Sequence, residues 1–388
     1  MANTLTNIIP QLLAGGLDTL REQAIMPRLV NRSIDAENRE RGDTIDVPVP
    51  TAITARDVTA AVTHATNQDT AAQKVQVILN QWKEGSFHLS DKDAEAVMAG
   101  FIPMQAQEAV KSLANSVDSY VLALYTGIYN YGGTAGTTPF ATNLDAFKTA
   151  RKWLNKSLAP FTDRRVVLDP DAEANALVLS QFLKADERGD QEGIISGQIG
   201  RKLGSDWYLN QNIPTHTKGT WTIVGTTQHT EIKATATLGT STAIFQASST
   251  TTTIGGTLVV GDIFTVTGSS QPYVVKTLAS IAKAAAATLS VAFSPVLDAT
   301  IAAAATVVHI ASHTVNLAFH RDAFACASRP LAKSQMDDTA RFMSVVDPIS
   351  GLALRLEVSR QYKQWTYSYD LLYGATLVRA PLAARILG

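Results

Sequence analysis

The sequence predicts an α+β protein that carries an inserted all-β domain. Apolar residues at helical spacing alternate along the chain with runs in which every second residue is apolar, which indicates helices and strands in one mixed domain. The composition changes from about residue 217 to 312, where Thr, Ala, Val and Gly dominate and only six charged residues lie between 231 and 312. After residue 312 the helix and strand patterns of the mixed domain return. The low-charge segment is therefore predicted to be inserted into the mixed domain, which lies before and after it in the sequence.

The bulk properties restrict the classes of function. With 388 residues, the chain exceeds the usual size of one compact domain. It is 45% hydrophobic and 17% charged, which suits a protein whose surface is covered by neighbours. The net charge of -1 provides no basic field for tight nucleic-acid binding. A single cysteine excludes an intrachain disulfide, and the absence of long apolar stretches predicts an unsecreted protein outside the membrane.

The first 90 residues predict elements with little core of their own. Apolar residues at helical spacing over 4–31, interrupted by prolines and glycines, predict a broken helical arm. Alternating runs at 44–50 and 75–79 predict a long β-hairpin, whose first strand lies at a sheet edge because Pro48 and Pro50 cannot donate hydrogen bonds. The arm is expected to lie on another part of the fold or on another subunit, and the hairpin to rest on a partner.

The host domain is predicted to contain a long helix and a mixed sheet. Residues 104–131 have helical spacing without a breaker before Gly127, which predicts one helix of roughly 25 residues. Residues 144–158 and 171–184 predict helices around a buried strand at 165–169. Later alternating runs predict long strands at 352–358 and 365–375. Within the low-charge segment, short runs such as 257–260 and 263–267 predict a small barrel or sandwich, and the alanine runs there are not expected to form a membrane span.

Several patterns that suggest chemistry have plainer interpretations. His309 and His313 would share a helix face and bind a metal, but the sequence before them favours strand or loop, so solvated histidines at a domain junction are expected. The glycine-rich loop at 132–138 lacks the Gly-Lys-Ser/Thr of a phosphate loop. The acidic residues at 186–192 and 337–338 lack the spacing of a calcium loop. Cys326 lies in an apolar run and is predicted to be buried. We therefore predict no enzyme, no catalytic residue, no cofactor and no metal site.

Three stretches are specific enough to suggest a family. They are Ile199-Gly200-Arg201-Lys202-Leu203-Gly204 running to Ile213-Pro214, Leu317 to Phe324 with Arg329-Pro330-Leu331, and Asp370-Leu371-Leu372-Tyr373-Gly374. Together with the order of elements over nearly the whole chain, these stretches resemble the major capsid proteins of tailed phages with the Hong Kong 97-type fold. Within that family they resemble the podovirus coat proteins that carry an inserted β-barrel domain.

The resemblance implies a domain plan. It comprises an N-terminal helical arm (1–38), an extended β-hairpin loop (39–89), a peripheral domain with the spine helix (90–140), a mixed axial and peripheral domain in two parts (141–215 and 313–388) and the inserted all-β domain (216–312). The region 193–204 would lie near capsomer centres. No set of Lys, Asn and Glu matches the interchain crosslink of the family, so covalent crosslinking is not expected.

The predicted contacts between subunits lie on the arm and the hairpin. The dense mixed-charge segment at 39–43 can be surface charge that contributes little to stability. At the base of an arm that lies across a neighbour, the same charges would set the register between subunits, and we favour this interface interpretation. The candidate interface residues are Arg39, Glu40, Arg41, Asp43, Arg56, Asp57, Trp82, Lys83 and Glu84.

The function implied by the resemblance is structural. Many copies would form hexamers and pentamers that close into an icosahedral shell around the genome. This virion protein would assemble in the host cytoplasm with a scaffolding protein and a portal, and would contact packaged double-stranded DNA non-specifically. Two alternatives remain open: a nanocompartment shell of the same fold that holds an enzyme, and a non-catalytic, glycan-binding β-rich protein, which would be a monomer with clustered exposed aromatic residues.

Overall fold

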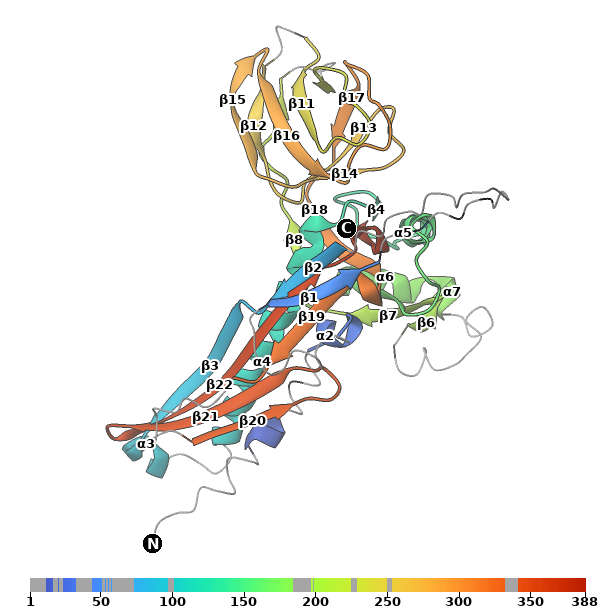
Figure 1. Ribbon diagram of the computed structural model, residues 1–388. Coiled ribbons are helices and arrows are strands. Elements are labelled where there is room, and N and C mark those ends of the chain that lie inside the picture. Colours follow the sequence, from blue (N-terminus) through green and yellow to red (C-terminus); the bar gives the residue numbers. More distant parts are fainter. Residues whose placement is uncertain are drawn as a thin grey trace, which may run out of the picture. The chain divides into compact units, whose positions relative to one another are not determined.

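The computed structural model of the chain divides into two compact units (Figure 1). The first comprises Met1–Val117 and Phe324–Val378, and the second Asp118–Ala323 and Arg379–Gly388. The residues described are 12–16, 20, 24–32, 44–50, 53, 55, 57, 73–96, 101–183, 197, 199–224, 229–249, 253–331 and 341–388.

A five-stranded antiparallel sheet forms the body of the first unit. Its order is β19-β22-β21-β20, and β3 also pairs with β22. Tyr367, Tyr369 and Tyr373 share one face of β22 and are all buried, as the two-residue repeat of a strand requires. The long C-terminal strands predicted from the sequence are confirmed. The strands are β3 (Gln81–Ser90), β19 (Phe324–Arg329), β20 (Arg341–Val346), β21 (Ala353–Gln361) and β22 (Gln364–Leu377).

The predicted long helix is present but ends earlier than expected. Helix α4 spans Phe101–Ala123, and a short 3-10 helix, η2 (Leu124–Gly127), follows it. The prediction of helix up to residue 131 is wrong, because Ile128 is already extended and Tyr131–Gly132 form strand β4. At the other end, Pro103 lies in the first turn, where a helix does not need its missing N–H. The short helix α3 (Asp91–Ala96) precedes α4, and Ser90 caps it by accepting a hydrogen bond from the Asp93 amide at 3.1 Å.

The predicted hairpin is confirmed as a two-stranded antiparallel sheet. β1 (Thr44–Val49) pairs with β2 (Gln73–Ile78), with Ile45 opposite Val77. Both side chains are buried in a small apolar cluster with residues of β19 and β22, including Ala325 and Leu372. The strands of the hairpin therefore rest on the sheet of their own chain, and most of the predicted tip lies outside the described residues.

Gly374 fixes how closely the hairpin approaches the sheet. A Cβ added there would lie 2.1 Å from the carbonyl oxygen of Ile78, so no side chain fits without a backbone shift. We expect Gly374→Ala to lower the free energy of unfolding by about 1–3 kcal/mol because the hairpin must move off the sheet. Urea unfolding of the two proteins measures this loss. Gly15→Ala is the control, since nothing lies within 4 Å of the added Cβ, and an equal loss in both variants would contradict the packing argument.

The described part of the arm lies on its own unit. Residues 12–16 are helical, and α2 spans Met26–Leu29. The Tyr369 hydroxyl donates a hydrogen bond to the Leu12 carbonyl at 3.1 Å, and both residues are buried. Further along, Asn31 forms a parallel bridge with Ala325 of β19. Among the described residues of the arm, Leu13, Leu20 and Leu29 are buried.

A mixed sheet and three helices form one part of the second unit. The sheet has the order β4-β23-β18-β5-β7-β6, and β8 also pairs with β18. Helix α5 (Asp145–Lys156) buries Phe147, Ala150 and Leu154 against it, at the spacing of one helix face. The predicted helix 171–184 is two helices, α6 (Pro170–Val178) and α7 (Ser180–Leu183). The strands are β4 (Tyr131–Gly132), β5 (Arg164–Leu168), β6 (Gly200–Lys202), β7 (Ser205–Leu209), β8 (Thr215–His216), β18 (His313–His320) and β23 (Ala383–Leu387).

The low-charge segment forms the small barrel that its strand pattern predicts. Six strands close in the order β10-β11-β16-β14-β13-β17, beside a three-stranded sheet, β15-β12-β9 (Figure 1). Phe245, Phe264, Tyr273 and Phe293 fill the interior in edge-to-face and stacked contacts. The barrel strands are β10 (Thr230–Ile232), β11 (Thr242–Ala247), β13 (Ile263–Val266), β14 (Tyr273–Val275), β16 (Thr288–Ser294) and β17 (Thr306–His309). The others are β9 (Thr222–Ile223), β12 (Thr253–Leu258) and β15 (Ala279–Ala285).

Candidate assembly surfaces and a buried polar junction

Only some of the residues predicted to form subunit contacts lie within the described residues. Arg39, Glu40, Arg41, Asp43 and Arg56 lie outside the described residues, and Asp57 is exposed. The remaining three, Trp82, Lys83 and Glu84, lie next to one another near the start of β3 and are all exposed. No contact with a second subunit is part of this structure, so their role stays a prediction.

Trp82 is held in place although 64% of it is exposed. Its indole Nε1 donates a hydrogen bond to Asp370 Oδ2 at 3.0 Å, and Arg355 binds the same buried carboxylate from β21, with its Nε 2.9 Å from Oδ1. A large aromatic surface that is fixed before binding loses little conformational entropy, which is typical of anchor residues in interfaces.

The loop between α5 and β5 displays a second apolar surface. Leu158 is 89% exposed and Phe161 is 70% exposed, whereas Ala159 between them is buried. The buried Arg164 holds this loop from inside: its Nε donates to the Pro160 carbonyl at 2.7 Å, its Nη2 to the Ala159 carbonyl at 2.6 Å, and its Nη1 to the Asn155 side chain at 2.7 Å. Its guanidinium also lies over the Phe161 ring. We call residues 157–163 the apolar loop.

We expect Arg164→Met to loosen the apolar loop. The change removes three charge-assisted hydrogen bonds and leaves the buried Ala159 carbonyl without that donor, a loss of about 1–3 kcal/mol in the free energy of unfolding. Thermal unfolding checks the loss, and limited proteolysis at Phe161 checks the loop. Arg201→Met is the control, because the Arg201 side chain is 64% exposed. Unchanged cleavage at Phe161 would show that Arg164 does not order the loop.

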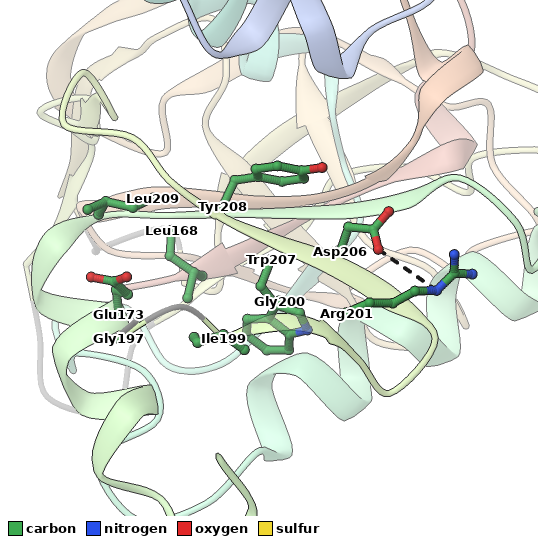
Figure 2. Close-up of a pocket in the computed structure, with 10 residues that line it drawn as sticks. All are labelled: Leu168, Glu173, Gly197, Ile199, Gly200, Arg201, Asp206, Trp207, Tyr208 and Leu209. Atoms are coloured by element: carbon green, nitrogen blue, oxygen red, sulfur yellow. Dashed lines mark ion pairs between the residues drawn. The ribbon is translucent and has the colours of Figure 1, made fainter. Parts of the chain in front are cut away.

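A pocket of about 510 Å³ opens beside β7 in the second unit (Figure 2). Figure 2 shows Trp207 and Tyr208 pointing to opposite sides of the strand, with Glu173 and Ile199 on the side of Trp207. Leu168 and Leu209 add apolar surface, and Arg201 and Asp206 form an ion pair of 3.8 Å. Burial raises the pKa of the Glu173 carboxyl, which makes no ion pair among the described side chains.

A buried polar cluster joins the barrel to the mixed sheet. Arg385 of β23 is fully buried and donates from Nη1 to the carbonyl of Gly261, in the turn before β13, at 2.9 Å. Its guanidinium lies over the ring of Tyr125, 4.9 Å from the centroid. Burial lowers the pKa of Arg385 to about 9, opposed by the charges of Tyr125 and Asp262, so the group remains a cation at neutral pH.

His216 and Asp262 complete this cluster. Asp262, only 2% exposed, accepts hydrogen bonds from His216 Nε2 at 2.9 Å, the Val259 amide at 2.8 Å and the Gly219 amide at 3.2 Å. In the tautomer with the proton on Nε2, the His216 ring accepts a hydrogen bond at Nδ1 from the Tyr125 hydroxyl at 3.0 Å. We call Tyr125, His216, Asp262, His313 and Arg385 the junction cluster. Charges and hydrogen bonds at this density in a buried site fix one relative arrangement of barrel and sheet.

The prediction of solvated histidines at 309 and 313 is wrong. His313 is buried, its Nδ1 donates to the Ala311 carbonyl at 2.8 Å, and its ring lies 5.3 Å from that of His216. Both ring nitrogens of His309 are buried among Trp221, Phe245 and Phe264. Burial lowers the pKa of each histidine to about 4. Their predicted place at a domain junction fits the structure, because β17 ends at His309 and β18 begins at His313.

The described ranges contain neither a metal-binding cluster nor a membrane-spanning helix. Among these residues, no group of three or more His, Cys, Asp or Glu side chains is placed to hold a metal ion. No helix in the same ranges is long and apolar enough to cross a membrane. Cys326 is buried, as its apolar surroundings predicted.

The junction cluster and the apolar loop were both missed in the sequence. A signal for the first exists: Arg385 is the single charge in the apolar C-terminal run Leu382 to Leu387, and Asp262 is one of six charges in the low-charge segment. Isolated charges in apolar strands are expected to be paired when buried. The apolar loop has no such signal, because Leu158 and Phe161 read like ordinary core residues.

Comparison with solved structures identifies the fold. A structure from Mycobacterium phage Che8 matches with a TM-score of 0.52 and 15% identity, covering 94% of this chain and 90% of that one. The capsid structure of Cyanophage P-SCSP1u matches with a TM-score of 0.50 and 11% identity, covering 93% and 87%. Searches with protein-family profiles and among curated proteins find no match. The chain therefore has the fold of phage capsid proteins, and the expected resemblance is confirmed at the level of the fold.

Proposed function

We propose that this chain is the major capsid protein of a tailed double-stranded DNA phage. Copies assemble into hexamers and pentamers that close into an icosahedral shell around the genome, and the protein acts without catalysis. The observation that carries the proposal is the match to phage capsid structures over nearly the full length of both chains, at 94% of this chain and 90% of the other for the first. A match of that extent involves nearly all elements of both chains, and not only one substructure that many folds share.

Within this proposal the elements take specific roles. The segment 1–38 is the arm, 39–89 the extended hairpin loop, α4 the spine helix, and 216–312 the inserted domain. Residues 141–215 and 313–388 form the mixed axial and peripheral domain. The fixed Trp82 side chain, with Lys83 and Glu84 beside it, supports a role for the start of β3 in contacts with a neighbouring subunit. A scaffolding protein, a portal and packaged DNA are the partners in assembly.

Size-exclusion chromatography followed by negative-stain electron microscopy tests the proposal. The protein is expressed alone and together with the products of its neighbouring genes. We expect capsomer rings or closed shells. A protein that stays monomeric at high concentration and with every candidate scaffold contradicts the proposal and favours glycan binding. Shells that enclose an enzyme, and neither DNA nor a scaffolding protein, contradict the phage assignment and favour a nanocompartment.

A further inference from the structure

The second unit has two apolar surfaces, an exposed loop and a pocket, that can fit each other. The apolar loop presents Leu158 and Phe161 to solvent in a conformation fixed by Arg164. The pocket beside β7 has apolar walls from Leu168, Ile199, Trp207 and Leu209 (Figure 2). Its volume of about 510 Å³ lies within the range of about 300–1,000 Å³ of sites that bury small ligands, so it can admit the side chains of a loop.

The apolar loop does not fill the pocket of its own chain. Neither Leu158 nor Phe161 lines it. The loop ends just before β5, whereas Leu168, which lines the pocket, is the last residue of that strand. Each copy of the chain therefore carries the apolar loop and the pocket as two separate surfaces.

The charges around the two surfaces are also complementary. Lys156, in the last turn of α5, lies two residues before Leu158 and is exposed. Glu173 of α6 is half-buried in the pocket wall and has no cation among the described residues as its partner. A second copy that seats its apolar loop in the pocket brings Lys156 toward Glu173, and such rim charges set the orientation of docking.

We propose that the apolar loop of one copy of this chain inserts Leu158 and Phe161 into the pocket beside β7 of a neighbouring copy. The contact is heterologous, because it joins two different surfaces, and repeated contacts of this kind close into rings when the rotation between copies allows it. The inference rests on the proposed shell function and names one contact within a capsomer.

Disulfide crosslinking tests the contact directly. Phe161→Cys and Glu173→Cys are combined in one chain, in which the native Cys326 is buried. After assembly and mild oxidation, we expect a non-reducing gel to show a ladder up to pentamers and hexamers. Mixing the two single-cysteine proteins should give dimers and nothing larger. The control pairs Glu173→Cys with Leu238→Cys, a barrel residue that is 64% exposed, and should not crosslink.

A second variant measures the contribution of the apolar side chain. Phe161→Ser should raise the protein concentration needed for assembly by about tenfold or more, since aromatic anchors in pockets dominate interface energies. Leu238→Ser is the matched control and should assemble as the unmodified chain does. Lys156→Glu should also weaken assembly, and adding Glu173→Lys should restore it. Circular dichroism confirms that each variant is folded.

The outcomes separate this contact from the proposed function. If the unmodified chain forms shells but Phe161→Ser assembles at the same concentration and the double-cysteine ladder is absent, the contact is wrong and the shell function stands. Dimers from Phe161→Cys alone would also overturn it, because they would show that two loops meet each other. If the unmodified chain never assembles, both the contact and the shell function are wrong.

Discussion

Replacing Asp262 by alanine is expected to lower the free energy of unfolding of the barrel and its junction by about 3–5 kcal/mol, a large part of the stability of a domain. The carboxylate is 2% exposed and accepts hydrogen bonds from His216, Gly219 and Val259. Alanine leaves those donors buried without this acceptor. It also removes the negative charge that opposes the burial cost of Arg385.

Two further variants separate the causes of that loss. Asp262→Asn keeps an oxygen acceptor but removes the charge, so its loss should be intermediate. Asp298→Ala is the matched control in the same barrel: Asp298 accepts hydrogen bonds from Ser269, Ser270 and Tyr273, but it is exposed. Its loss should be about 1 kcal/mol, because water replaces the lost partners. Thermal unfolding and hydrogen exchange of peptides from β12 to β14 measure the three losses. Equal losses for Asp262→Ala and Asp298→Ala would refute the importance of burial.

The sequence predicted elements whose pattern is local. The barrel segment was recognisable because Thr, Val and Gly replace charged residues over a long stretch, and the C-terminal strands because Leu354, Leu356 and Val358 alternate with polar residues. The early end of α4 was missed, because no proline or glycine lies between Met104 and the 3-10 helix at Leu124–Gly127. The helix propensities of the residues that follow Ala123 would by themselves have continued the helix.

The isolated charges Arg385 and Asp262 indicate buried polar contacts, but their partners could not be predicted because the members of the junction cluster are far apart in the chain. Tyr125, His216, Asp262 and Arg385 meet only when β8, β13 and β23 are in place. The two histidines at 309 and 313 show the same limit. Their spacing drew attention, but solvation was the wrong expectation, since their burial depends on Trp221, Phe264 and other residues remote in sequence.

The buried histidines predict that the second unit loses stability in acid. The pKa of His309 and of His313 falls from 6.5 to about 4 in the folded protein, chiefly through burial and then through the cations Lys218 for His309 and Arg385 for His313. The folded state therefore favours the neutral ring, and between these two values the unfolded chain binds more protons. Stability is complete above about pH 6.5 and falls toward pH 4 by about 1.4 kcal/mol per pH unit for each histidine.

Over that interval each histidine accounts for a loss of about 3 kcal/mol, and the two together for about 6 kcal/mol. Urea unfolding at a series of pH values measures the slope. His309→Phe should remove half of it with little cost at neutral pH, because the ring packs among Phe245, Phe264 and Trp221 and its nitrogens have no hydrogen-bond partner among the described residues. His88→Gln, at an exposed position on β3, should leave the slope unchanged. The same slope in His309→Phe as in the unmodified chain would show that acid acts through other groups.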